Sequence, residues 1–278
     1  MINEIPIVRI ESGDNTAQIS PKGAYISQVS LAGSEILKES EDKIQTHGGC
    51  AILIPYSGRV RNGVYYFEKN KYQLPINDNF GNSIHGFAKE RMFEVDNLKT
   101  STIKLSTVID EPSYPSKLRI SADYTVDKGS FRVKLIVSNI GFSNAPLIVG
   151  AHPYFIYDRD WEISFSESLS RFDMEDSLFP SNTARSAKTS YKNEPKAFGR
   201  FKYYIGGGTI KFFNGKQTLV IKRRNMQYLT IYVGEFTRNR SVAIEPQSGL
   251  PDAFNNKIGL KVIRPQNKME FSFQFEVK

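Results

Sequence analysis

Hydrophobic and polar residues alternate along this chain over many short stretches. From Phe131 to Val137 every second side chain is apolar, and from Glu270 to Val277 the same period of two is unbroken. A period of two places alternate side chains on opposite faces of a β-strand. The pattern therefore predicts strands here and at residues 209–213, 218–222, 229–233 and 242–244.

Turn-forming sequences separate these strands: Asn62-Gly63, Asp127-Lys-Gly129, Gly206-Gly-Gly208 and Asn214-Gly215. The triple glycine is expected to be a flexible hairpin turn, because no helical pattern and no Gly-Lys-Ser/Thr follows it, as a phosphate-binding loop would require. No stretch of 12 residues or more has a convincing amphipathic helical pattern. Short strands with frequent turns predict an all-β protein built as a large antiparallel sandwich.

The organisation of the chain points to one domain spanning residues 1–278, because composition does not change along it. The polar segment 177–196 contains Pro180 and Pro195 and is predicted to be one long loop that could close over a site. No apolar run approaches the roughly 18–20 residues that cross a bilayer. The N-terminal stretch has no apolar block typical of a signal peptide, so we expect a cytoplasmic protein. The single cysteine, Cys50, excludes an intrachain disulfide and a cysteine-rich metal site.

The net charge of +8 is unevenly distributed. Between Arg200 and Arg240 one acid, Glu235, stands among seven further basic residues: Lys202, Lys211, Lys216, Lys222, Arg223, Arg224 and Arg238. These cations are either a solvated basic surface or, if they share a face, a binding surface for an anionic ligand or a nucleic acid.

The stretch GAHPYFIYD at residues 150–158 holds one of only three histidines. Pro153 restricts His152 toward an extended conformation, which limits where the imidazole can point. Tyr154 and Phe155 offer flat apolar faces of the kind that pack against sugar rings. The alternative is a purely structural histidine in a proline turn. Of the other two histidines, His85 lies where a strand-like end meets a glycine, and His47 lies in a loop context without an expected role.

Two further segments carry groups suited to chemistry. Glu245 shares a strand face with Ala243 and is expected to end that strand before Pro246; the alternative is an exposed strand end. Arg59 and Arg61 are two residues apart, so in an extended segment they would share a face. A guanidinium suits hydroxyls, carboxylates or phosphates.

Taken in chain order, four segments resemble the aldose 1-epimerase (galactose mutarotase) family: IPYSGRVRNGVYYFEKNKYQLPIN (54–77), NSIHGFAKERMFEV (82–95), GAHPYFI (150–156) and IEPQSGLPDAFNN (244–256). The resemblance implies a large antiparallel β-sandwich with a sugar lying across one sheet, and interconversion of the α and β anomers of a free aldose. By motif match, His152 would be the general acid and Glu245 the general base. The same match makes Arg59 and His85 the residues that hold the sugar, with Tyr154 and Thr230 as further candidate contacts.

The implied reaction needs only proton transfers. The ring of a cyclic hemiacetal opens when the C1 hydroxyl loses a proton and the ring oxygen gains one, and reclosure after rotation inverts the anomeric centre. One acid and one base suffice, each typically contributing about 10²–10⁴-fold. We therefore expect no metal and no other cofactor. The expected partner is a small-molecule sugar, with no nucleic acid and no membrane, and the expected state is a monomer or homodimer.

The chain departs from the family at three sugar contacts. Gly58 stands where the family usually has Asn, no Asp occurs in residues 198–206, and Thr230 occupies a place that often holds Gln. Basic residues lie close in sequence to these positions: Arg61, Arg200 and Lys202. That combination would suit a sugar with a negative group, such as a phosphate, sulfonate or uronate.

Two other functions compete with an epimerase. A catalytically silent sugar-binding sandwich would keep the cleft without the activity, but the retention of both His152 and Glu245 argues against it. Nucleic-acid binding is suggested only by the basic segment and its aromatic residues. Their period-two spacing favours a place in the core instead.

Overall fold

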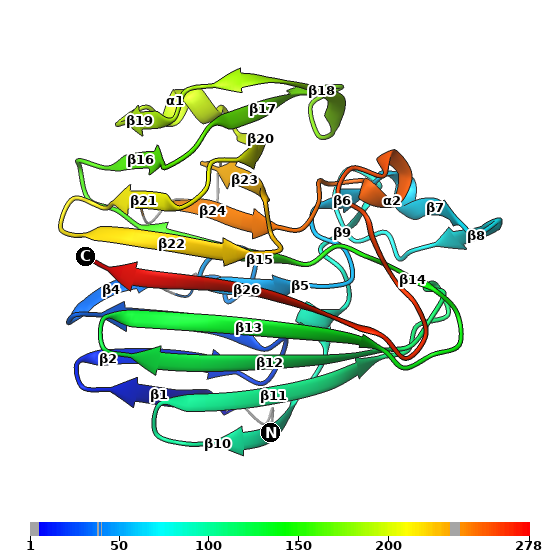
Figure 1. Ribbon diagram of the computed structural model, residues 1–278, viewed down its shortest axis with the longest axis horizontal. Coiled ribbons are helices and arrows are strands. Elements are labelled where there is room, and N and C mark those ends of the chain that lie inside the picture. The colour runs from blue at the N-terminus through cyan, green and yellow to red at the C-terminus, as the bar shows by residue number, and fades with distance from the viewer. Residues whose placement is uncertain (1–5, 38, 40, 234–239) are drawn as a thin grey trace.

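The structure is a computed structural model that describes residues 6–37, 39, 41–233 and 240–278. Within these residues, two large antiparallel sheets pack face to face, and three small ribbons and two short helices extend from them (Figure 1). The predicted large antiparallel sandwich is confirmed. The helices are α1 (Pro195–Phe198) and α2 (Ala253–Asn256), and single 3-10 turns form η1 (Arg61–Gly63) and η2 (Ala88–Glu90).

The larger sheet has eleven strands. In spatial order they are β1 (Val8–Ser12), β2 (Asn15–Ser20), β3 (Tyr25–Leu31), β4 (Ser34–Leu37), β15 (Gly150–Ile156), β24 (Ser241–Gln247), β23 (Tyr228–Tyr232), β20 (Phe201–Gly206), β17 (Leu169–Met174) and β18 (Pro180–Ala187), with β5 (Cys50–Leu53) pairing with both β15 and β3.

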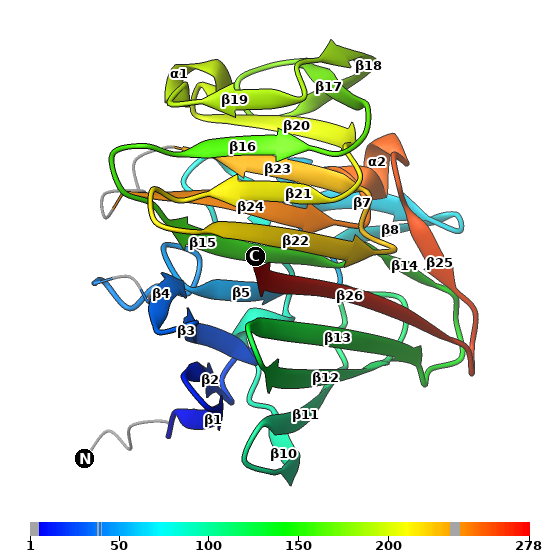
Figure 2. The same cartoon turned by 60° about the vertical axis from the view of Figure 1, so that its left-hand side comes forward.

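The smaller sheet has nine strands and covers one face of the larger one (Figure 2). Its order is β10 (Glu94–Leu98), β11 (Thr102–Ile109), β12 (Leu118–Asp127), β13 (Ser130–Asn139), β26 (Lys268–Val277), β22 (Thr218–Arg224), β21 (Ile210–Phe213), β16 (Glu162–Phe165) and β19 (Ser190–Lys192). The ribbons are β14 (Ala145–Leu147) with β25 (Lys261–Ile263), β6 (Arg59–Val60) with β9 (Ser83–Ile84), and β7 (Val64–Phe67) with β8 (Asn70–Gln73).

The core between the sheets follows from the alternation of the sequence. On β13 the side chains of Phe131, Val133, Leu135 and Val137 are buried, while Arg132 between them is exposed. On β26 the buried side chains are Phe271, Phe273 and Phe275. Burial of these apolar faces is the main favourable contribution to folding, at about 25 cal/mol for each Å² removed from water.

Strand β15 divides its side chains between two environments. Phe155 points into the core, where its ring centroid lies 5.7 Å from that of Phe212 and 4.9 Å from that of Phe275, both on the smaller sheet. His152 belongs to the alternate set, so it lies on the opposite face of the larger sheet. Of the two aromatic rings proposed to pack against a sugar, only Tyr154 lies on the His152 face, because adjacent residues of a strand point to opposite faces. The proposal is wrong for Phe155.

The connections confirm predicted turns and overturn two other predictions. Asp127-Lys-Gly129 joins β12 to β13 as a hairpin, as expected. Asn214-Gly215 joins β21 to β22 as a hairpin, as expected. The segment Gly206–Gly208 does not form a hairpin, because it carries the chain from β20 in the larger sheet to β21 in the smaller one. Residues 177–196 are not one long loop, since they contain β18, β19 and α1, and none of them lines the cavity described below.

The basic segment between positions 200 and 240 is distributed over several surroundings. Lys222 pairs with Glu276 at 2.5 Å, and Arg223 is partly buried and donates to backbone carbonyl groups, including that of Met226 at 3.2 Å. Two residues of the segment, Glu235 and Arg238, lie outside the described part of the chain. In the described ranges, no helix is both long and apolar enough to span a membrane.

Candidate active site

A cavity of about 480 Å³ opens on the face of the larger sheet that is turned away from the smaller one. Its floor comes from the four neighbouring strands β15, β24, β23 and β20. Its rim comes from the loop between β4 and β5, the segment around β6 and β9, and η2. The cavity has the size typical of a small-molecule site.

The register of the strands brings the candidate catalytic residues together. Gly150 pairs with Gln247 and Tyr154 pairs with Ala243, so His152 and Glu245 lie side by side between these pairs. The row continues across the sheet, because Thr230 pairs with Glu245 and Tyr203 pairs with Thr230. Residues about 90 positions apart in sequence thus form one continuous floor.

His152 and Glu245 are in direct contact, with His152 Nε2 at 3.3 Å from Glu245 Oε1. Both side chains are almost fully buried, with exposed fractions of 7% and 4%. Burial raises the pKa of Glu245 to about 8, although the bond from Gln247 and the charge of Arg59 oppose this. Burial also lowers the pKa of His152 to about 3. Both shifts have the same cause, because a low-dielectric site disfavours a lone charge of either sign.

Gln247 holds the Glu245 carboxylate and was missed by sequence reasoning. Its Nε2 group donates to Glu245 Oε2 and to Thr230 Oγ1, both at 3.0 Å. Pro246 was expected to end the strand at Glu245, but β24 continues to Gln247. The signal was present in the sequence, because residue 247 is two positions beyond Glu245 and therefore lies on the same strand face.

Gln247→Leu is expected to lower the kcat/KM of an acid–base reaction at this pair about tenfold, because the Glu245 carboxylate loses a hydrogen bond that orients it. The lost bond also favoured the ionised form, so the pKa of Glu245 should rise and the alkaline limb of the pH profile should move to higher pH. The control is Gln227→Leu, which changes an exposed side chain in the connection just before β23. An unchanged rate and pH profile in Gln247→Leu would show that Gln247 has no positioning role.

His85 is held by an unusual backbone on the cavity wall. Its φ is 68°, and its Nδ1 accepts from the Gly58 N–H at 3.3 Å, so a neutral ring carries its proton on Nε2. Burial and the nearby charges of His152, Lys89 and Arg59 keep the pKa of His85 well below its usual value. The ring is therefore a neutral hydrogen-bond donor.

The glycine at position 58 has a structural reason. Its φ is 71°, and a Cβ there would lie 2.6 Å from the Pro251 ring. A side chain at this position would require both a left-handed backbone and movement of Pro251. The departure from Asn at this place therefore agrees with the local packing.

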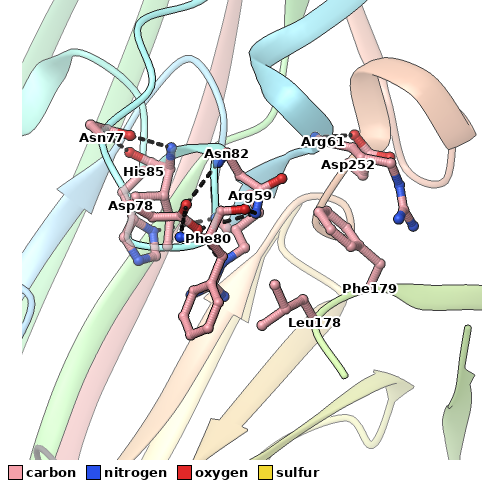
Figure 3. Close-up of polar contacts among 12 residues, drawn as sticks. Arg59, Arg61, Asn77, Asp78, Phe80, Asn82, His85, Leu178, Phe179 and Asp252 are labelled. Atoms are coloured by element: carbon pink, nitrogen blue, oxygen red, sulfur yellow. Dashed lines mark hydrogen bonds and ion pairs between the residues drawn. The ribbon is translucent and has the colours of Figure 1, made fainter. Parts of the chain in front are cut away.

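Arg59 is anchored by an aspartate that also organises the neighbouring loop (Figure 3). Arg59 Nε donates to Asp78 Oδ2 at 2.7 Å. Asp78 Oδ1 accepts from the backbone N–H groups of Asn82 at 2.7 Å and Phe80 at 2.9 Å. Although burial opposes ionisation, these bonds hold the pKa of Asp78 below its usual range. Asp78 thus positions both the guanidinium and the turn that carries Phe80.

Arg61 does not share the cavity with Arg59, so that prediction is wrong. The extended segment ends at Val60, and Asn62 has a φ of 53° inside η1. Arg61 consequently reaches Asp176 at 2.9 Å, and its guanidinium carbon lies 4.0 Å from the centroid of the Phe179 ring. Figure 3 shows the two arginines leading to different groups of residues.

The remaining predicted contacts, Tyr154 and Thr230, both line the cavity. The Tyr154 ring stacks on His152 with centroids 4.8 Å apart, and its hydroxyl donates to the Thr46 carbonyl at 2.7 Å. Tyr154 therefore supports the imidazole as well as lining the site. Residues that the sequence did not indicate also line the cavity. Tyr203 lies on β20 in the floor, whereas the others come from connecting segments far apart in sequence: His47, Phe80 and Lys89.

The sandwich and this cavity define a class of all-β proteins with a buried histidine–glutamate pair on the outer face of a large sheet. Comparison with known families agrees, because the aldose 1-epimerase profile matches residues 6–276. The chain belongs to the aldose 1-epimerase family.

The individual relatives share only a small fraction of their residues with this chain. The uncharacterized protein YihR of Escherichia coli K12 is 26% identical over 276 residues, covering 92% of this chain and 88% of that protein. A galactose mutarotase-like protein from Lactobacillus casei has a TM-score of 0.86 at 18% identity, covering 98% of this chain and 100% of that one. Galactose 1-epimerase from Lactobacillus acidophilus has a TM-score of 0.79 at 15% identity, covering 98% and 94%. At these identities the two solved structures establish likeness of fold.

Proposed function

We propose that this protein is a mutarotase, which interconverts the α and β anomers of an aldose by acid–base catalysis. The observation that carries this proposal is the contact of His152 with Glu245 at the floor of a sugar-sized cavity. The hydroxyl oxygen and the ring oxygen that exchange protons in this reaction are both bonded to C1. An acid and a base close to each other are therefore what the reaction needs.

The reaction proceeds through the open-chain aldehyde. Glu245 takes the proton of the C1 hydroxyl while protonated His152 gives its proton to the ring oxygen, and the bond between C1 and the ring oxygen breaks. Rotation about C1–C2 presents the other face of the carbonyl. The former ring oxygen, now a hydroxyl, then attacks C1 and gives its proton back to His152. Glu245 returns its proton to the carbonyl oxygen, which becomes the new C1 hydroxyl. The pair is regenerated and no atom is gained or lost.

The pair carries one proton in total during this cycle. With one proton, the two groups are either imidazolium and carboxylate or both neutral, and each arrangement has no net charge. The raised pKa of Glu245 and the lowered pKa of His152 make the neutral pair the resting arrangement, with the proton on Glu245. The positive charge of Arg59 opposes this preference and so reduces the cost of moving the proton to His152, which gives the arrangement that starts the reaction. In this proposal Arg59 and His85 also hold sugar hydroxyls, with Tyr154 and Thr230 as neighbouring contacts.

Polarimetry of freshly dissolved α-glucose and α-galactose tests the proposal. The optical rotation is expected to relax faster than in buffer, with a rate that rises in proportion to protein concentration. A sugar-binding protein without activity is the competing function. It would be indicated by ligand-induced thermal stabilisation without faster relaxation for any aldose, neutral or charged.

A further inference from the structure

Two arginine side chains lie near one aromatic ring, that of Phe80, at the cavity rim. The guanidinium carbon of Arg59 lies 5.5 Å from the centroid of the Phe80 ring, and that of Arg200 lies 5.8 Å from it. Both distances are within the range of cation–π attraction. Phe80 is 53% exposed and is held by the Asp78 turn. The ring thus brings together two arginines that come from β6 and from the segment before β20.

A third cation lines the same wall. The Lys89 side chain on η2 is only 15% exposed, and its ammonium group contacts Glu90 at 2.5 Å. Glu90 is 62% exposed and does not line the cavity. Lys89 and Arg59 both lie close enough to His85 to lower its pKa. Basic side chains and the neutral His85 ring therefore line the wall from Lys89 past Arg59 to Arg200, with Lys89 paired to Glu90 and Arg59 paired to Asp78.

The carboxylates of the cavity already have partners within the protein. Among the lining side chains that the structure describes, the carboxylates are Asp78 and Glu245. Asp78 is bound to Arg59, and Glu245 is in contact with His152 at 3.3 Å. Each guanidinium has five N–H donors, so an arginine that makes one contact still has donors to offer. The rim is therefore suited to receive a negatively charged group from a ligand.

We infer that the aldose handled at this site carries an anionic substituent, which Arg200 and Arg59 bind beside Phe80, with Lys89 adding to the attraction. This inference rests on the proposed function and names its substrate class. A phosphate, a sulfonate or a carboxylate would each meet the requirement, because guanidinium groups bind oxyanions through paired N–H donors.

The basic residues that can bind an anionic group differ from those that the sequence suggested. Arg61 is turned toward Asp176, and Lys202 alternates on β20 with Phe201 and Tyr203, which line the cavity. Lys202 therefore faces away from the cavity floor. Of the three cations close in sequence to the altered family positions, only Arg200 reaches the cavity, where it joins Arg59 and Lys89.

The experiment measures exchange between anomers by saturation transfer between their C1 protons in NMR, which requires no pure anomer. The substrates are glucose, galactose, glucose 6-phosphate, 6-deoxy-6-sulfoglucose and glucuronate, and the spontaneous rate in matched buffer is subtracted from each. The expected result is a kcat/KM at least tenfold higher for one or more of the charged sugars than for glucose. Comparison of the three charged sugars identifies the anion.

Variants locate the charge that causes the preference. Arg200→Gln is expected to reduce the ratio of charged to neutral kcat/KM about tenfold or more, because it removes charge-assisted hydrogen bonds. Lys202→Gln makes the same charge change two residues away and should leave the ratio unaltered. The preference should also weaken as salt rises from 0.05 to about 0.5 M, because rim charges are screened.

Two results would overturn the inference, and they differ from each other. Equal kcat/KM for neutral and charged sugars, unaffected by Arg200→Gln, would reject the anionic substrate while leaving a mutarotase in place. Exchange that is not accelerated for any of the five sugars would reject the proposed function, and this inference with it.

Discussion

Glu245→Gln and His152→Gln are each expected to lower the kcat/KM for anomer exchange by about 10²–10⁴-fold. Gln keeps the approximate size of the glutamate side chain but cannot accept the C1 hydroxyl proton. At position 152, Gln cannot deliver a proton to the ring oxygen. The two groups act as one unit, so the double variant should lose little more than either single variant.

Controls separate lost chemistry from lost folding. Both variants should melt cooperatively, with Glu245→Gln at least as stable as the wild type, because it removes a buried ionisable group whose charged form is disfavoured. Glu162→Gln removes a carboxylate from β16, on the other sheet, and should retain full activity. If Glu245→Gln or His152→Gln still accelerated exchange as the wild type does, that residue would not be a proton-transfer group.

The pH profile of kcat/KM is expected to show a broad plateau with a tenfold loss for each pH unit above about 8. The catalytic pair is competent when it holds one proton. Adding a second leaves a lone buried imidazolium, which burial opposes until the pH falls to about 3, the lowered pKa of His152. Removing the last proton leaves a lone buried carboxylate, which burial opposes until the pH rises to about 8, the raised pKa of Glu245.

The signs of both shifts therefore widen the active range. An exposed pair would lose activity above the ordinary histidine pKa near 6.5 and below the ordinary glutamate pKa near 4.3. Initial rates at each pH, with recovery of activity confirmed after return to pH 7, distinguish titration of the site from unfolding. A steep fall in kcat/KM centred near pH 6.5 would contradict the proposed coupling of His152 and Glu245.

Much of the sheet structure could be predicted from period-two alternation. The strands around Phe131 and Phe273 have one apolar face and one polar face, which leaves a single register that buries the apolar one. The connections were less predictable. Gly206–Gly208 is typical of a hairpin in composition, but its direction depends on which sheet the next strand joins. Segment 177–196 is polar because its strand β18 lies at a sheet edge with most side chains exposed.

At the site, motif matching placed His152 and Glu245 in one cavity, but local geometry decided the rest. Arg61 fails to follow Arg59 because the strand ends at Val60. Gln247 is hard to predict because Pro246 suggests a strand end at Glu245, whereas β24 continues to Gln247. Phe80 reaches the rim through a turn that Asp78 holds, and Lys89 reaches it on η2, which is bonded to the Ile54 carbonyl. No short pattern in the sequence specifies either path.

The division of the cavity between strands and loops has an evolutionary consequence. His152 and Glu245 sit on adjacent central strands of the larger sheet, where a substitution in one strand disturbs its neighbours. The groups at the rim are carried by short connecting segments around β6, β9, η2 and β20. Natural selection can exchange these segments with little effect on the proton-transfer pair. Substitutions in the rim segments can therefore change the sugar that such a protein binds, while the proton-transfer residues stay the same.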